Sequence, residues 1–337
     1  MEDTHICLAH GNGGRYMREL IEQVFGKHLR GPLLDTNADA VPLPWSAADG
    51  ELVMTTDGFT VQPLEFPGGD IGSLAVHGTT NDLAVCGAVP RYLSLNVFIE
   101  EGFEIERLDR LIASLARAAR ELDVQVAAGD TKVLRRGEGG GLYLATTGIG
   151  VRPRGLQLGL QHIRTGDAVL LSGPIGAHGV AVLLAREQFG LRGDLHSDAA
   201  SVLPLTLALR ELPGLRFMRD PTRGGLATVL HEVAQVTGLG VGVREEMIPV
   251  QAPVRAVCEM LGYDPYYLAC EGRVIAVVAR ESALEALARW QRLDAGEQAA
   301  IIGHVGAAPA GRVMLATTLG GERYLEELED DPLPRIC

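Results

Sequence analysis

The sequence lacks three features that would place the protein in a special class. It has no run of about 18 apolar residues, so no transmembrane helix is expected. It has no basic tract, and 30 lysines and arginines against 43 acidic residues give a net charge of −13, which disfavours binding to nucleic acid or an anionic membrane. Its 5 cysteines are widely spaced without a CxxC pair, so neither a disulfide framework nor a structural zinc site is expected.

The rest of the composition is typical of a folded globular protein. The chain has 337 residues, of which 47% are hydrophobic and 22% charged, and this balance excludes wholesale disorder and suggests about two domains. Its 42 glycines follow no fixed period, so they indicate many turns and loops in which the backbone can approach a ligand. The start MEDTHICLAH has no basic segment followed by an apolar one, so no signal peptide is expected and a cytoplasmic location is predicted.

Alternating helix and strand patterns predict an α/β or α+β fold. Apolar residues at helical spacing predict a long amphipathic helix over 105–122, with strand patterns on both sides of it, one of them over 51–57. A further helical pattern covers 198–211. A new strand in GDAVLLSGPIG follows a connecting stretch and begins a second domain. We therefore expect an N-terminal domain at 1–155, a C-terminal α/β domain at 156–320 and a flexible acidic tail at 321–337.

A glycine-rich segment precedes the first helical pattern. It reads His10-Gly11-Asn12-Gly13-Gly14, and glycines before a helix let backbone amides approach a phosphate closely. The segment matches neither a Walker A nor a GxGxxG pattern. His10, Gly11 and Gly13 are therefore candidate nucleotide ligands, and an ordinary turn that begins a helix is an equal alternative.

Several aspartates lie where strands and loops end. Mg²⁺ takes hard oxygen ligands and is shared between carboxylates and nucleotide phosphates, although each such residue can equally cap a helix or turn. Asp82 stands out because its segment is otherwise small and apolar, where an unpaired carboxylate is costly. The candidates are Asp39, Asp57, Asp82, Asp130 and Asp220.

Three further residues have side chains suited to catalysis. Thr131 and Lys132 follow a strand-ending Gly-Asp pair and can contact a phosphate or a carbonyl oxygen. Glu271 precedes an apolar strand and is a candidate general base if it is desolvated. A surface lysine and a solvated turn acid remain the alternatives for Lys132 and Glu271.

The final residue, Cys337, lies on a tail with no evident core to join. Twelve residues of extended chain reach roughly 40 Å, so the terminal thiol can serve as a swinging arm that carries a substrate on its sulfur. Arg335 adds a fixed positive charge for docking. The other cysteines lie in apolar company and are predicted to be core or near-core residues: Cys7, Cys86, Cys258 and Cys270.

Taken together, segments along essentially the whole chain resemble the HypE family of hydrogenase maturation factors. This family belongs to the superfamily of aminoimidazole ribonucleotide synthetase and selenophosphate synthetase, and PRIC at the C-terminus is specific to HypE. The matching segments are AHGNGG at 9–14, the run from TTDGF to GAVP at 55–90, FIEEGF at 98–103, AAGDTKV at 127–133, RDPTRGGLA at 219–227, CEGR at 270–273 and PRIC at 334–337.

The resemblance implies a PurM-like fold of two α/β domains and an ATP-dependent reaction. The N-terminal sheet would close with that of a second copy into an intersubunit β-barrel, with ATP in a cleft near the interface of this homodimer. The carbamoyltransferase HypF would place a carbamoyl group on Cys337, and this carbamoyl dehydratase would convert the thiocarboxamide to a thiocyanate. The cyanide would pass to iron on the HypC–HypD complex, for the [NiFe] hydrogenase centre.

The resemblance also implies site roles, residue by residue. Cys337 would carry the substrate, Glu271 would be the base at its nitrogen, and Lys132 and Thr131 would act near the phosphate or the thiocarboxamide oxygen. Two alternatives stay open: another ATP-dependent synthetase such as selenophosphate synthetase, and a non-catalytic maturation scaffold. The remaining implied ligands are Asp39, Asp57, Asp82 and Asp220 for Mg²⁺ and the nucleotide, and His10, Gly11, Gly13 and Asp130 for the nucleotide.

Overall fold

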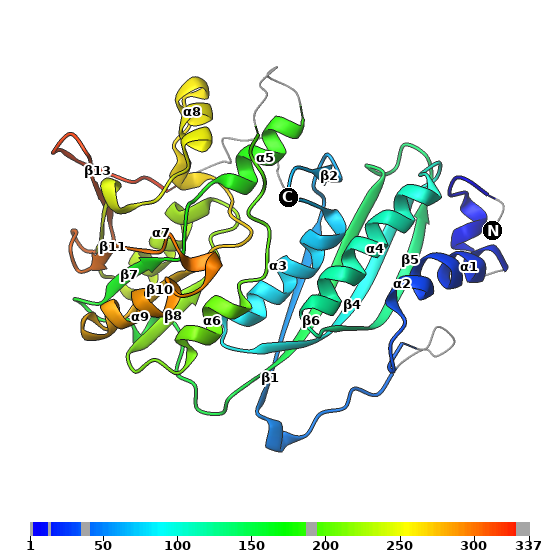
Figure 1. Cartoon of the computed structure of the whole chain (residues 1–337), viewed down its shortest axis with the longest axis horizontal. Coiled ribbons are helices and arrows are strands. Elements are labelled where there is room, and N and C mark those ends of the chain that lie inside the picture. Colours follow the sequence, from blue (N-terminus) through cyan, green and yellow to red (C-terminus); the bar gives the residue numbers. More distant parts are fainter. Residues whose placement is uncertain (1–2, 13–14, 35–40, 187–193, 328–337) are drawn as a thin grey trace.

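The structure, a computed structural model, describes residues 3–12, 15–34, 41–186 and 194–327, which form two α/β domains side by side (Figure 1). Among the described helices, none has both the length and the apolar character that a membrane span requires. The N-terminal domain is built on a four-stranded sheet in the order β1-β6-β4-β5. Its strands are β1 (Glu51–Phe59), β4 (Val89–Glu100), β5 (Gln125–Leu134) and β6 (Leu142–Arg152).

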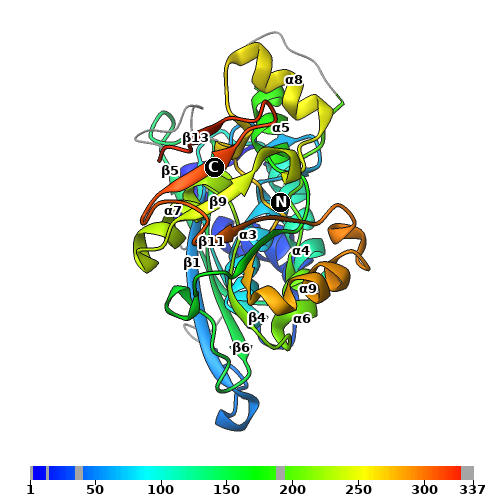
Figure 2. The same ribbon diagram turned by 90° about the vertical axis from the view of Figure 1, so that its left-hand side faces the viewer.

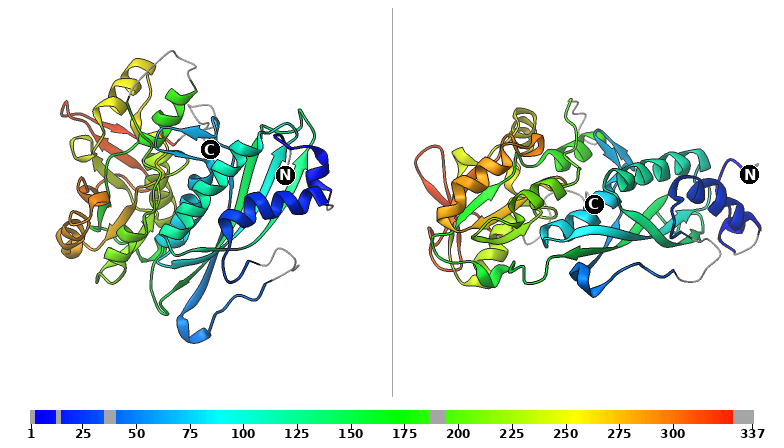
Figure 3. Two further views of the ribbon diagram at one scale, coloured as in Figure 1. Left: turned by 45° about the vertical axis from the view of Figure 1, so that its right-hand side comes forward. Right: turned by 60° about the horizontal axis from the view of Figure 1, so that its bottom comes forward.

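Helices cover one face of this first sheet (Figure 3). The amphipathic helix α4 (Ile105–Glu121) buries an apolar stripe that includes Leu108 and Leu115. Helix α3 (Ile71–Val85) is buried nearly all round, because it contacts the sheet, α4 and the second domain. Smaller elements complete the domain: η1 (Leu8–Gly11), α1 (Arg15–Leu20), η2 (Ile21–Gly26), α2 (Lys27–Leu29), η3 (Ala47–Asp49), β2 (Glu65–Phe66) and β3 (Gly69–Asp70).

The other face of the first sheet is open and partly apolar. On β1, Leu52 is 50% exposed and Met54 is 71% exposed. The strand register places Met54 opposite Ile149, and Ile149 opposite Tyr92, so apolar side chains form a row across three strands. In the described residues β1 and β5 are edge strands, so this face has two unpaired edges.

The C-terminal domain contains a seven-stranded mixed sheet between helices (Figure 2). Its order is β13-β12-β9-β11-β7-β10-β8. The strands are β7 (Ala168–Leu171), β8 (Leu215–Arg219), β9 (Val241–Arg244), β10 (Ile275–Val278), β11 (Ala300–Val305), β12 (Val313–Ala316) and β13 (Glu322–Tyr324). The helices are α5 (Ala177–Ala185), α6 (Leu203–Arg210), α7 (Gly225–Thr237), α8 (Ala252–Leu261) and α9 (Ala283–Trp290).

Both faces of this second sheet are covered, which explains its uninterrupted apolar strands. On β7, Val169 and Leu171 join the core that includes α7, whereas Ala168 and Leu170 join the core that includes α6 and α9. All four residues are completely buried. Strand β10 divides its side chains between the two cores in the same way.

Two stretches differ from the sequence-based expectation. The helical pattern over 198–211 predicts one helix, but α6 begins only at Leu203, and residues 198–202 belong to no helix or strand. The flexible tail expected over 321–337 is wrong for residues 322–325, because β13 pairs with β12 and Leu325 is 1% exposed, with its carbonyl accepting a hydrogen bond from His231 Nε2 at 2.8 Å. A three-residue charged strand shows no alternation of apolar residues by which the sequence would reveal it.

Candidate active site

Three of the predicted aspartates converge at the boundary between the domains. Asp57 lies on β1, Asp82 on α3, and Asp220 directly after β8. Thr55 Oγ1 donates a hydrogen bond to Asp82 Oδ2 at 2.8 Å, and the Gly58 N–H donates to Asp57 Oδ1 at 2.7 Å. We call Asp57, Asp82 and Asp220 the acidic cleft.

A glycine brings the first two of these carboxylates together. A Cβ atom on Gly78 would lie 2.8 Å from the Phe59 ring and 3.8 Å from Asp57 Oδ2. Because this space is empty, β1 packs closely against α3. Residues four apart share one face of a helix, so Asp57 meets α3 beside the turn that carries Asp82.

Burial and mutual repulsion raise the pKa values of the carboxyl groups in the acidic cleft. Burial, followed by the charge of Asp82, raises the pKa of Asp220 to about 7. Burial also raises the pKa of Asp57 and of Asp82, and the Asp57 charge adds to the effect on Asp82. The Arg223 guanidinium acts in the opposite direction on Asp57 and Asp82. The carboxylates are near enough for the charge of one to raise the pKa of another, and carboxylate oxygens are ligands that a divalent cation prefers.

A cavity of about 280 Å³ adjoins Asp82 between the domains, and Thr55, Arg152 and Arg219 also line it. The two arginines provide positive charge next to the carboxylates. Cys86 lines the same cavity and is exposed, so its predicted near-core position is wrong, because it caps the C-terminus of α3 at the domain boundary.

The other cysteines vary in their burial. Cys258 and Cys270 are buried as predicted, and Cys7 is half-buried. Cys337 lies outside the described residues, as do Gly13 and Asp39.

Glu271 lies beside the acidic cleft. It is only 5% exposed and directly precedes the short stretch that leads into β10. The N–H of Cys270 donates to the carbonyl of Pro221 at 3.0 Å, and the side chain of Asn81 donates to the carbonyl of Glu271 at 3.2 Å. These two bonds join Glu271 to the neighbours of Asp220 and Asp82, so the predicted base and the predicted metal ligands meet at one boundary.

Asp130 and Lys132 lie elsewhere in the same chain. They project from the open face of β5 and form an ion pair at 2.9 Å. The register connects Asp57 through Thr146 and Leu95 to Gly129, which is three strand spacings, or about 14 Å. The chain therefore separates the Gly-Asp-Thr-Lys segment from its own acidic cleft.

Thr131 does not share a face with its neighbours. It is 5% exposed and points to the opposite side of β5 from Asp130 and Lys132. Its N–H donates to Asp130 Oδ1 at 2.8 Å. The expectation that the Thr131 side chain acts together with Lys132 therefore disagrees with the alternation of side chains along the strand.

The described part of the glycine-rich segment packs against β5. A Cβ on Gly11 would lie 2.8 Å from Val133. The His10 ring is completely buried, its Nδ1 accepts a hydrogen bond from the Cys7 N–H at 3.0 Å, and its Nε2 lies 3.5 Å from a carboxylate oxygen of Asp3. In this arrangement the ring supports the turn and is not presented to a nucleotide.

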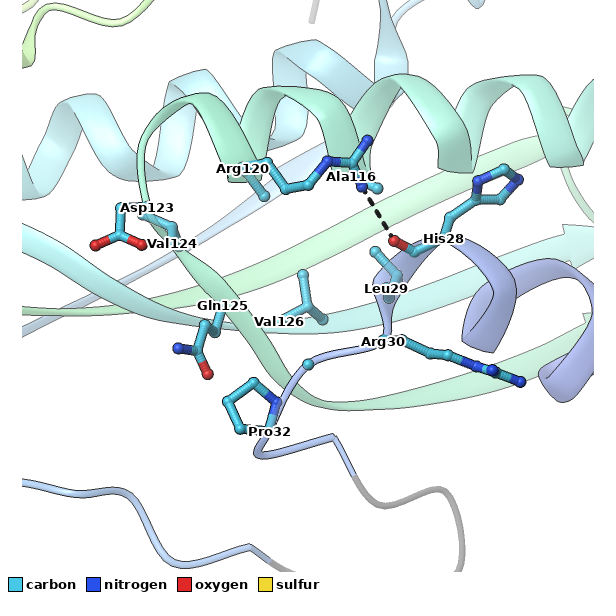
Figure 4. Close-up of a pocket in the computed structure, with 12 residues that line it drawn as sticks. His28, Leu29, Arg30, Pro32, Ala116, Arg120, Asp123, Val124, Gln125 and Val126 are labelled. Atoms are coloured by element: carbon cyan, nitrogen blue, oxygen red, sulfur yellow. Dashed lines mark hydrogen bonds between the residues drawn. The ribbon is translucent and has the colours of Figure 1, made fainter.

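A smaller cavity of about 200 Å³ lies between α2 and the end of α4 (Figure 4). Arg120 Nη1 donates to the carbonyl of His28 across it at 3.2 Å. Neither Lys132 nor Glu271, the two predicted catalytic residues that the structure describes, lines this cavity.

Comparisons with known proteins identify the family of this chain. The family model for the N-terminal domain of AIR synthase related proteins matches residues 37–152, and the model for their C-terminal domain matches residues 164–316. Carbamoyl dehydratase HypE of Azotobacter vinelandii is 46% identical over 338 residues, covering 100% of this chain and 98% of the relative.

Two solved structures are also similar. A crystal structure of the hydrogenase maturation protein HypE in complex with ATP is 44% identical with a TM-score of 0.92, covering 98% of this chain and 99% of that one. A HypE chain in a HypE–HypF complex is 40% identical with a TM-score of 0.80, covering 92% and 99%. The chain therefore belongs to the HypE family of carbamoyl dehydratases, within the AIR synthase related proteins.

Proposed function

We propose that this protein uses ATP to dehydrate a carbamoyl group on the sulfur of Cys337, which yields a thiocyanate. The observation that carries the proposal is the meeting of the acidic cleft with the buried Glu271 at the domain boundary. The relatives are carbamoyl dehydratases, and one similar structure was solved with ATP. The cyanide would serve [NiFe] hydrogenase maturation in the cytoplasm, with HypF as carbamoyl donor and the HypC–HypD complex as cyanide acceptor.

The chemistry requires the amide oxygen to become a leaving group. Transfer of the γ-phosphoryl group to that oxygen forms a C–O–P linkage and releases ADP. Loss of inorganic phosphate and of both nitrogen protons then forms the C≡N bond, so thiocarboxamide and ATP give thiocyanate, ADP and phosphate. Glu271, withdrawn from water beside the cleft, accepts a nitrogen proton.

The acidic cleft fits Mg²⁺. Its donors are carboxylate oxygens whose repulsion a bound cation would relieve. Asp57, Asp82 and Asp220 would hold the ion, which when bound neutralises phosphate charge. Arg219 and Arg223 lie near the same carboxylates and are placed to interact with phosphate oxygens.

The open face of the first sheet supports a homodimer. Met54 and the apolar row across β1, β6 and β4 would be buried against a second copy of the chain. Closing two such sheets into a barrel also removes the unpaired edges of β1 and β5. The dimer would bring the partner's Lys132 towards the acidic cleft, which the Lys132 of the same chain does not reach.

The test is the intact mass of the protein after incubation with HypF, carbamoyl phosphate and ATP. We expect a carbamoyl adduct on the peptide that contains Cys337, followed by loss of one water from that adduct. Cys337→Ala should fold normally and show neither change. Cys258→Ala, which removes a cysteine of α8 outside the cavity that adjoins Asp82, is the matched control and should behave like the wild type. Dehydration by Cys337→Ala would refute the proposal.

A further inference from the structure

We propose that Asp198 and Asn81 are positioning residues that fix the backbone of Glu271 from two sides of the domain boundary. The inference deepens the proposed function, because it rests on Glu271 as the base. Asp198 lies in the segment 194–202 before α6, which forms no helix or strand and which we call the strap, and Asn81 lies on α3. Neither residue has a recognisable signal in the sequence for this role.

The residues from 271 to 273 are built around Asp198. The side chain of Asp198 is 3% exposed, and its Oδ1 accepts hydrogen bonds from the N–H groups of Glu271 and His178, both at 3.2 Å. Its Oδ2 lies 3.4 Å from Arg273 Nε. Residue 272, between Glu271 and Arg273, must be glycine, because a Cβ atom at this position would lie 1.9 Å from the carbonyl oxygen of Asp198.

Asn81 holds the other side of Glu271. It is 1% exposed, and its Nδ2 donates to the carbonyls of Glu271 at 3.2 Å and Ala200 at 2.9 Å. Its Oδ1 accepts from the N–H of Val202 at 2.9 Å. One side chain from the N-terminal domain therefore binds both the strap and the backbone carbonyl of Glu271.

The two contacts together fix the backbone from which the side chain of Glu271 extends. Its N–H is held by Asp198 and its carbonyl by Asn81, and Asn81 is followed directly by Asp82 of the acidic cleft. The distance between base and metal ligand therefore depends on side-chain bonds rather than on a shared strand or helix. A misplacement of about 1 Å at a reacting centre can lower a rate by about 100-fold.

The first experiment separates positioning from folding. We expect Asp198→Ala and Asn81→Ala to lower kcat for water loss by about 10- to 100-fold, with the KM for ATP unchanged. Asp198→Asn keeps an oxygen for the Glu271 N–H, so it should retain more rate than Asp198→Ala, and it also serves if the alanine variant does not fold.

A matched control lies in the same strap. Ser197→Ala removes hydrogen bonds between Ser197 Oγ and His178 Nδ1, at 2.8 Å, and between Ser197 Oγ and the Ala199 N–H, at 3.0 Å. We expect it to lower the free energy of unfolding and leave kcat unchanged. An equal fall in kcat for Ser197→Ala and Asp198→Ala would overturn the positioning role.

The second experiment combines each substitution with Glu271→Gln. If Asp198 acts through Glu271, Asp198→Ala should cause no further loss of kcat in the Glu271→Gln protein. Multiplicative losses would overturn the positioning role and leave Glu271 as the base. A wild-type rate for Glu271→Gln alone would instead refute the base, and the inference about Asp198 with it.

Discussion

Replacing Asp220 by asparagine should stabilise the metal-free protein at alkaline pH and abolish its use of ATP. Asp220 is 8% exposed, and burial together with the Asp82 charge raises its pKa from 3.8 to about 7. Asparagine keeps the shape of the side chain but cannot ionise. The substitution therefore removes a charge that the folded protein holds at a cost, and with it an oxygen ligand for Mg²⁺.

The sign and size of this effect follow from proton linkage. The folded protein binds the Asp220 proton more tightly than the unfolded chain does, so its stability falls as the pH rises from 3.8 through about 7. The pKa of Asp220 is about three units higher in the folded protein than in the unfolded chain, and each unit corresponds to 1.36 kcal/mol. Asp220→Asn should therefore raise the free energy of unfolding by about 4 kcal/mol at pH 8 and by about 2 kcal/mol at pH 5.

The assay is urea denaturation at several pH values, with one series in EDTA for the metal-free protein and a second series in Mg²⁺ and ATP without EDTA. Asp264→Asn, which removes a surface carboxylate paired with Arg323 at 2.7 Å, is the control and should change stability by less than about 1 kcal/mol. Nucleotide and Mg²⁺ at about 100 times their Kd should stabilise the wild type by about 2.7 kcal/mol and leave Asp220→Asn unchanged. A gain in stability that is the same at every pH would refute the reasoning.

Three further predictions concern other parts of the proposed site. Asp82→Asn should abolish ATP hydrolysis measured as phosphate release, because the carboxylate is a proposed metal ligand, and normal turnover would reject that role. Met54→Glu places a charge on the open face of the first sheet and should give monomers in light scattering, whereas Leu284→Glu, at an exposed position on α9, should not. Lys132→Ala should slow water loss with little change in the affinity for ATP measured by calorimetry, and an unchanged rate would remove Lys132 from the mechanism.

Local patterns in the sequence predicted most of the first domain. The apolar residues spaced at 3.6 over 105–122 predicted a helix, and the structure has α4 at Ile105–Glu121. The pattern is informative because an amphipathic helix must bury one apolar stripe. The pattern over 51–57 appears within β1. The helix expected over 198–211 was wrong in its first residues, because hydrogen bonds that the Asn81 and Asp198 side chains make with Ala200, Val202 and Glu271 hold the strap outside the helix and override its local propensity.

The sequence predicted which residues belong to the candidate site but not how they are arranged in space. Motifs and an unusual carboxylate in an apolar helix were enough to single out Asp57, Asp82, Asp220 and Glu271. The sequence did not show that Lys132 faces away from them, because strand order is decided by long-range pairing and only the register shows which strands separate two residues. The sequence did not single out Asp198 either, because its contacts with Glu271 and Arg273 join segments that are distant in the chain.

The sequence by itself determined which chemistry-bearing side chains the chain carries, where many of its helices and strands lie, and the family to which it belongs. Only the tertiary structure decided which of these groups meet. Burial depends on residues distant in the chain. The raised pKa of Asp220 and the two-sided hold on Glu271 arise where the two domains pack together, and the His10 ring is buried by packing within the first domain. Preferences for helix or strand act over a few neighbouring residues. A functional site forms where segments distant in the chain pack together and bury one another's polar groups.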